Sequence, residues 1–92
     1  MIRSFADRDT QQIFNRLHSR RYAAIERAAL RKLRQISSVS AVEELREPPG
    51  NRLEKLKANR EGQWSLRINE QYRICFRWSE GDAYEVEIVD YH

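Results

Sequence analysis

The chain has 92 residues, of which 40% are hydrophobic, a formal net charge of +3 and one cysteine, Cys75. This composition excludes a disordered chain and an internal disulfide, and the length predicts one domain, residues 1–92, with a shallow surface cleft. No long apolar run follows the first methionine, which argues against a signal peptide and a membrane anchor. We therefore expect a cytoplasmic protein that does not bind membranes.

Charge is distributed unevenly along the chain. Residues 16–34 contain seven Arg and Lys residues against one Glu, and residues 51–69 contain five against two. Residues 70–92 contain six acidic residues against two basic ones. Two basic segments in so small a protein indicate a polyanionic partner. Charge alone does not distinguish RNA, DNA, a membrane or an acidic protein, and a basic helix face is about as often simply solvated.

Helical signals occupy the first half of the chain. After a β-compatible segment at residues 2–5, Asp7 is a suitable N-cap for a helix that carries Ile13, Phe14 and Leu17. A second helix is predicted from about Ser19 to Ser37, because its apolar residues recur with helical spacing and share one face. Its opposite face carries an arginine stripe, which consists of Arg20, Arg27, Arg31 and Arg34.

The apolar period changes to two in the second half. Pro48 and Pro49 end a short third helix predicted over Ala41–Arg46. Alternating residues then predict strands over 64–68, 72–78 and 84–88, with Tyr84 facing the core. The polar face carries Arg67, Arg73, Arg77, Glu85 and Glu87, for which cross-strand ion pairing is the simplest interpretation. We predict an α+β fold in which N-terminal helices pack on a small antiparallel sheet with a mixed edge.

The residues needed for most cofactor and metal chemistry are missing from the sequence. It contains neither a P-loop nor a dinucleotide-binding glycine motif, and His18, Cys75 and His92 are too far apart for an ordinary zinc site. Acidic residues near the C-terminus alternate between the two faces of the predicted strand, which disfavours a Mg²⁺ site. If the protein is an enzyme, we expect one without metal and without cofactor.

Metal-free RNA cleavage would fit the remaining residues. In this reaction a 2′-hydroxyl attacks the neighbouring phosphate, and the protein supplies a base, an acid and cations that stabilise the transition state. The last three residues, Asp90, Tyr91 and His92, have suitable chemistry. Asp90 and Tyr91 should face opposite sides of a regular strand, however, and chain ends are usually poorly ordered.

Three stretches of sequence resemble the HigB toxins of the RelE superfamily: MIRSF at the start, NREGQWSLRINEQYRICFRW, and GDAYEVEIVDYH at the end. The similarity covers nearly the whole chain and is closest from Asn51 to His92. It implies a microbial-ribonuclease-like α+β fold and cleavage of mRNA in the A site of the bacterial ribosome. It also implies neutralisation by a HigA-like helix-turn-helix antitoxin, through which alone the toxin would contact operator DNA.

The same resemblance implies the residues of the site. The catalytic cleft would include Lys57, Arg73, Asp90, Tyr91 and His92, with Arg60 nearby, and the arginine stripe would contact ribosomal RNA or the antitoxin. One departure is Glu54, which stands where well-known members of the family have a histidine. Its carboxylate could act as a general base, or form an ion pair with Lys57 or Arg73, but it cannot bind phosphate as a cation would. We therefore expect a weaker or differently assigned nuclease.

Two alternatives remain open at this point. The substitution of Glu54 favours a binding module that has kept the fold, lost the activity and acts with its antitoxin as a co-repressor. Direct DNA binding by the basic helix is a weaker hypothesis, because the arginine stripe lacks the Asn and Gln side chains that read base edges.

Overall fold

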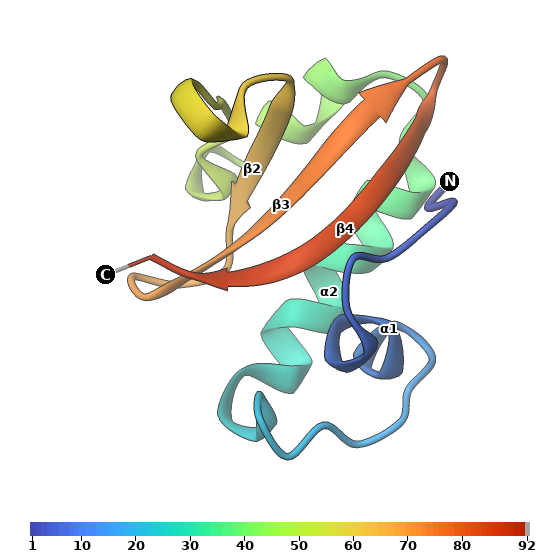
Figure 1. Cartoon of the computed structure of the whole chain (residues 1–92), viewed down its shortest axis with the longest axis vertical. Helices are drawn as coiled ribbons and strands as arrows, with labels where there is room; N and C mark the ends of the chain where they lie inside the picture. Colours follow the sequence, from blue (N-terminus) through green and yellow to red (C-terminus); the bar gives the residue numbers. More distant parts are fainter. Residues whose placement is uncertain (92) are drawn as a thin grey trace.

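The computed structural model describes residues 1–91, so the predicted site residue His92 lies outside the described part. All but one of the helical elements of the described residues precede a four-stranded sheet along the chain, and the exception, η4, lies between the first two strands (Figure 1). The helical elements are α1 (Arg8–Phe14), η1 (Ala23–Ile25), α2 (Glu26–Ser38), η2 (Val42–Arg46), η3 (Pro49–Asn51) and η4 (Ala58–Arg60), where η denotes a 3₁₀ helix. The strands are β1 (Glu54–Lys55), β2 (Gln63–Arg67), β3 (Tyr72–Ser79) and β4 (Asp82–Asp90).

The sheet is an antiparallel meander with strand order β1-β2-β3-β4. The N-terminal segment lies beside β4 in the parallel direction, because Ile2 bridges to Ala83 and Phe5 bridges to Val86. This segment makes one edge of the sheet mixed. The predicted α+β class and the mixed edge are both confirmed.

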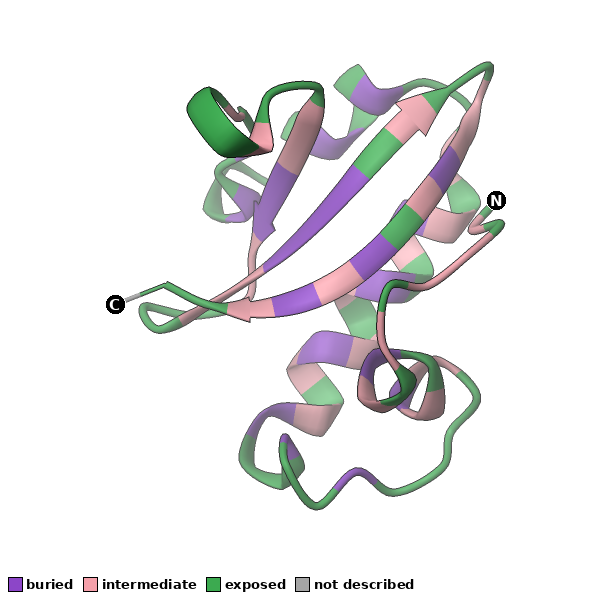
Figure 2. Ribbon diagram, in the orientation of Figure 1, coloured by how far each residue is buried: buried purple, intermediate pink, exposed green. Residues whose placement is uncertain are grey.

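Helices α1 and α2 cover one face of the sheet (Figure 1), and the core lies between them and the strands. Figure 2 shows buried residues along β2, β3, β4 and α2. On α2 they are Ala29, Leu33 and Ile36, at the helical spacing expected of a core face. The strands contribute Leu66, Ile74, Phe76, Val86 and Ile88. The other face of the sheet, called here the open face, carries the alternate residues of each strand.

Two predicted helix boundaries are wrong. Helix α2 begins at Glu26 because the Glu26 carboxylate accepts a hydrogen bond from the backbone N–H of Ser19 at 2.6 Å, which folds the preceding segment back as a loop. Arg20 therefore precedes the helix and is not on its surface. Helix α1 ends at Phe14, and Arg16 adopts a left-handed φ of 62° that turns Leu17 away from the core. The third helix is a 3₁₀ helix, η2.

A β-bulge in β4 changes which residues face the core. Glu85 has a φ of 52°, and the register between β3 and β4 shifts between Cys75 and Arg77. Tyr84 consequently pairs with Arg77 and shares the open face with it, so the predicted core position of Tyr84 is wrong. Ala83, fully buried, takes the core position instead. Strand β1, with only two residues, was not predicted from the sequence pattern.

Candidate active site on the open face of the sheet

Arg73 on β3 is the most firmly held cation of the open face. Its Nε donates to Ser65 Oγ at 2.8 Å, and its Nη2 donates to the carbonyl oxygens of Arg52 at 2.5 Å and Ser65 at 3.4 Å. Its Nη1 lies 4.0 Å from a carboxylate oxygen of Glu54, and the side chain is only 11% exposed. A fixed, partly desolvated guanidinium is well suited to bind a phosphate through two oxygens.

The carbonyl that holds Arg73 is itself fixed by a buried asparagine. Asn51 Nδ2 donates to the backbone carbonyls of Leu45 and Glu47, both at 3.1 Å. These bonds give partners to two backbone carbonyls that the end of η2 leaves without a helical hydrogen bond. Arg52, the next residue after Asn51, adopts a left-handed φ of 44°. The loop therefore presents the Arg52 carbonyl oxygen to Arg73 in a defined position.

Tyr91 lies next to Arg73 at the end of β4. The guanidinium carbon of Arg73 is 5.9 Å from the centre of the Tyr91 ring, which is within the range of a cation–π contact. The backbone N–H of Tyr91 donates to the carbonyl oxygen of Gln71 at 2.6 Å, which anchors the chain here. Tyr91 is 42% exposed, so part of its ring is accessible for stacking.

Asp90 lies on the other side of the strand from Tyr91. It pairs in register with Tyr72, whereas Arg73 pairs with Val89, so Asp90 and Arg73 leave the sheet on opposite faces. The Asp90 carboxylate accepts a hydrogen bond from Gln71 Nε2 at 3.2 Å. The structure thus brings Tyr91 to Arg73 but places the Asp90 side chain elsewhere, and the catalytic role of Asp90 stays a prediction.

Glu54 on β1 joins the open face through its pairing with Ser65 on β2. Of the two ion-pair partners considered for its carboxylate, Arg73 is the one that lies within 4.0 Å. This separation is beyond hydrogen-bond range, so the carboxylate stays available to accept a proton. We refer to Arg73, Glu54, Ser65, Tyr91 and the Arg52 carbonyl as the Arg73 cluster.

Lys57 and Arg60 flank the sheet on the η4 segment. Lys57 is the exposed N-cap residue of η4 and makes no side-chain hydrogen bond or ion pair within residues 1–91. Arg60 Nη1 donates to Gln63 Oε1 at 2.9 Å and lies 3.3 Å from Glu87 Oε2. Arg60 is therefore held over the open face, while Lys57 is unconstrained.

Cys75 is buried in the middle of the open face. Burial raises the pKa of its thiol, and the nearby Arg60 and Arg73 guanidinium groups oppose that effect only in part. A buried, protonated thiol is a poor nucleophile. Arg60 bonds to Glu87 and Arg73 bonds to Ser65, and both of these partners pair in register with Cys75, so the two arginines flank the same part of the sheet.

Sequence reasoning missed two groups that shape this face: Ser65 and the Arg52 carbonyl. Ser65 carried a usable signal, since the hairpin register that follows from the Asn69–Gln71 turn places it diagonally from Arg73. The Arg52 carbonyl carried none, because its position depends on the Asn51 hydrogen bonds.

Of the remaining predicted RNA-binding residues, the three on α2 lie on the far side of the molecule. Arg27, Arg31 and Arg34 are exposed on α2, on the helix face that points away from the sheet. They make no ion pair within residues 1–91, and Arg20 is exposed in the loop before η1. The structure brings the three helical arginines together but separates them from the Arg73 cluster.

The described part of the chain lacks the features of two other classes of site. Within residues 1–91, no three His, Cys, Asp or Glu residues lie close enough to hold a metal ion. No helix in that range is both long and apolar enough to cross a membrane.

Solved structures define the fold class. The whole chain superposes on 98% of a chain from a YoeB–YefM toxin–antitoxin complex of Staphylococcus aureus, with a TM-score of 0.57 and 14% sequence identity. A second structure of that complex gives a TM-score of 0.53 at the same identity and coverage. The chain therefore has the α+β fold of the RelE-like toxins.

Sequence comparison then gives the family. A family model described as the RelE-like toxin HigB of type II toxin–antitoxin systems matches residues 3–92. The chain is 39% identical over 85 residues to Toxin HigB-1 of Vibrio cholerae, covering 90% of each chain. It is 44% identical over 41 residues to Endoribonuclease HigB of Proteus vulgaris, covering 45% of each. This chain belongs to the HigB-like toxin family, as the sequence motifs had predicted.

Proposed function

We propose that this toxin is a metal-free endoribonuclease that cleaves mRNA on the ribosome. The observation that carries the proposal is the Arg73 guanidinium, held by Ser65 and Arg52 on the open face beside the accessible ring of Tyr91. The Proteus relative, which bears the name endoribonuclease, supports the same activity. A cation fixed before substrate arrives needs no reorganisation when charge develops on a phosphate.

The proposed reaction breaks the phosphodiester without a protein nucleophile. The 2′-oxygen of one nucleotide forms a bond to phosphorus, and the bond from phosphorus to the 5′-oxygen breaks, leaving a cyclic phosphate and a 5′-hydroxyl end. Arg73 binds the non-bridging oxygens as negative charge accumulates on them. Lys57 and Arg60 supply further positive charge, and a base stacks on Tyr91, a contact that is worth ~1–3 kcal/mol.

Proton transfer is assigned to the carboxylates and the terminal histidine. Glu54 takes the proton of the 2′-hydroxyl, because its carboxylate lies near Arg73 without a hydrogen bond to it. His92 gives a proton to the departing 5′-oxygen, and Asp90 supports His92. An arriving phosphate takes the place of Glu54 as the anion closest to Arg73, which frees Glu54 to act as a base.

The reaction takes place on the ribosome, and an antitoxin controls it. The substrate is mRNA in the ribosomal A site, the arginines of α2 together with Arg20 contact ribosomal RNA phosphates, and a HigA-like antitoxin neutralises the toxin in the cytoplasm. Phosphate contacts of this kind position a protein without reading sequence. Operator DNA is contacted only through the antitoxin.

A translation extract tests the proposal directly. Adding the purified protein should produce mRNA fragments with 5′-hydroxyl ends, and deleting Tyr91 and His92 should abolish them while the circular dichroism spectrum is unchanged. Fragments that persist after this deletion would remove the terminal residues from the mechanism.

One observation favours a second candidate, a co-repressor without catalytic activity. The Glu54 carboxylate partly neutralises Arg73, where the histidine of other family members would not. In this case the extract would yield no fragments at any concentration, although the protein would still bind its antitoxin.

A further inference from the structure

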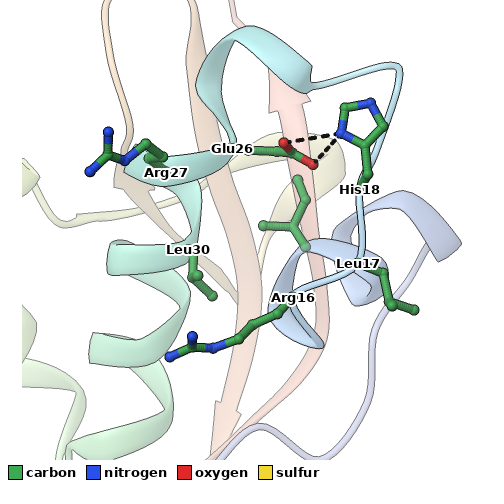
Figure 3. A pocket seen from close by; sticks show the side chains of 7 residues that line it. Arg16, Leu17, His18, Glu26, Arg27 and Leu30 are labelled. Atoms are coloured by element: carbon green, nitrogen blue, oxygen red, sulfur yellow. Dashed lines mark hydrogen bonds and ion pairs between the residues drawn. The ribbon is translucent and has the colours of Figure 1, made fainter.

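A cavity of about 320 Å³ lies between the end of α1 and the start of α2, away from the open face of the sheet (Figure 3). Its apolar lining comes from Ile13, Leu17 and Leu30, and its basic lining from Arg16 and Arg27. In Figure 3 the side chains of Arg16 and Arg27 extend to one side, whereas Leu17 points to the other. The cavity therefore offers an apolar surface beside two guanidinium groups.

Leu17 is exposed in a way that the local backbone enforces. Its side chain is 58% exposed, although the spacing of the first helix would have buried it. Arg16 adopts a left-handed φ of 62°, which is costly for a residue with a side chain. Backbone hydrogen bonds fix this turn, from Arg16 N–H to Ile13 at 3.0 Å and from Leu17 N–H to Gln12 at 2.7 Å. The turn thus holds the Leu17 side chain in solvent at the edge of the cavity, beside the two other apolar residues that line it.

The positive charges of Arg16 and Arg27 are not neutralised by the other residues that line the cavity. Its one acidic residue, Glu26, already accepts a hydrogen bond from the backbone N–H of Ser19 at 2.6 Å and pairs with His18 Nδ1 at 3.2 Å. Arg16 and Arg27 form no ion pair within residues 1–91. A complementary ligand therefore carries carboxylates next to an apolar side chain.

We propose that this cavity binds an acidic amphipathic segment of a protein partner. One apolar side chain of the segment packs against Ile13, Leu17 and Leu30, and its carboxylates pair with Arg16 and Arg27. A nucleobase fits less well, because His18, the one aromatic ring among the cavity-lining residues, is paired with Glu26. Arg27 also belongs to the α2 surface assigned above to ribosomal RNA, so the protein segment and the ribosome compete for it. Burying Leu17 supplies affinity, and the charge pairs supply orientation.

The test uses the ¹⁵N-labelled full-length protein and a synthetic amphipathic helical peptide. The peptide carries leucines four residues apart on one face and glutamates on the flanks of that face. A matched peptide replaces each glutamate with glutamine, and a single-stranded oligouridine serves as the nucleic-acid probe. Addition of the acidic peptide should shift backbone amide signals of residues 13–30, with little change in β2, β3 and β4.

Substitutions then locate the interaction. L17S removes an exposed side chain and should weaken peptide binding about tenfold, and R27E should weaken it at least as much. R46E changes an exposed arginine on η2 and serves as the matched charge control, with affinity unchanged.

Three results would overturn the proposal: equal affinity for the glutamine peptide, tighter binding of oligouridine to residues 13–30, or no shift in those residues. The readout is independent of RNA cleavage, so a failure here leaves the proposed nuclease activity untouched.

Discussion

At the scale of single residues, the guanidinium of Arg73 both anchors its own side chain and leaves a nitrogen that can bind a phosphate. Its Nε and Nη2 hold it to Ser65 and Arg52, while Nη1 faces Glu54 and the position proposed for the phosphate. A lysine at this position would keep the charge but has one nitrogen for both tasks. The planar fork of the guanidinium is therefore the property on which the site depends.

The variants R73A and R73K test this dependence. Both should lower mRNA cleavage in a translation extract by about 10²–10³-fold, the usual loss when a fixed transition-state donor is removed. R77A is the matched control, since Arg77 lies on the same strand and face and pairs with Glu85 at 2.9 Å. Full activity in R73K would show that charge alone suffices and would contradict the proposed geometry.

At the scale of elements, one polar contact caps α1 and a second joins the helix to the sheet. The Asp7 carboxylate accepts a hydrogen bond from the backbone N–H of Thr10 at 2.9 Å and caps the helix, as the sequence had predicted. Thr10 is fully buried, and its Oγ1 accepts from the backbone N–H of Ile88 on β4 at 3.0 Å. Loss of the cap therefore weakens both the helix and its contact with the sheet.

The variant D7A should lower the free energy of unfolding by about 1 kcal/mol, the typical contribution of an N-cap. D7N keeps an oxygen that can accept the same bond, so it should retain most of the stability. Urea unfolding followed by circular dichroism measures both. Equal stability of D7A and the unsubstituted protein would show that the cap contributes nothing.

The sequence predicted the strands of the sheet more completely than the contacts that hold the candidate site together. Strands β2, β3 and β4 followed from apolar alternation, because each has one face on the core. The bulge at Glu85 did not, since a residue other than glycine with positive φ leaves no local signal. Motif resemblance supplied Arg73, Tyr91 and Glu54, and the structure brings these three together. What holds Arg73 depends on long-range register and on the Asn51 loop, which short sequence patterns do not encode.

At the scale of the whole molecule, positive charge is divided between two opposite surfaces. The Arg73 cluster lies on the open face of the sheet, and Arg27, Arg31 and Arg34 lie on the far side of α2. A single phosphodiester cannot contact both surfaces across the helix and sheet layers that separate them. If the substrate is bound on the sheet, the arginines of α2 contact a different part of a large polyanion, which the proposed ribosomal setting would provide.

The double variant R31E/R34E tests this division through the salt dependence of its affinity for ribosomes. For every arginine that no longer binds a phosphate, the slope of log affinity against log salt concentration should become shallower by about one unit. Co-sedimentation with ribosomes at several salt concentrations measures that slope, with R46E as a control for charge reversal elsewhere on the surface. A slope unchanged from the unsubstituted protein would mean that these arginines are simply solvated. A shallower slope in the double variant alone would place α2 against ribosomal phosphates, because the control reverses the charge of an exposed arginine on η2 that is not part of the stripe.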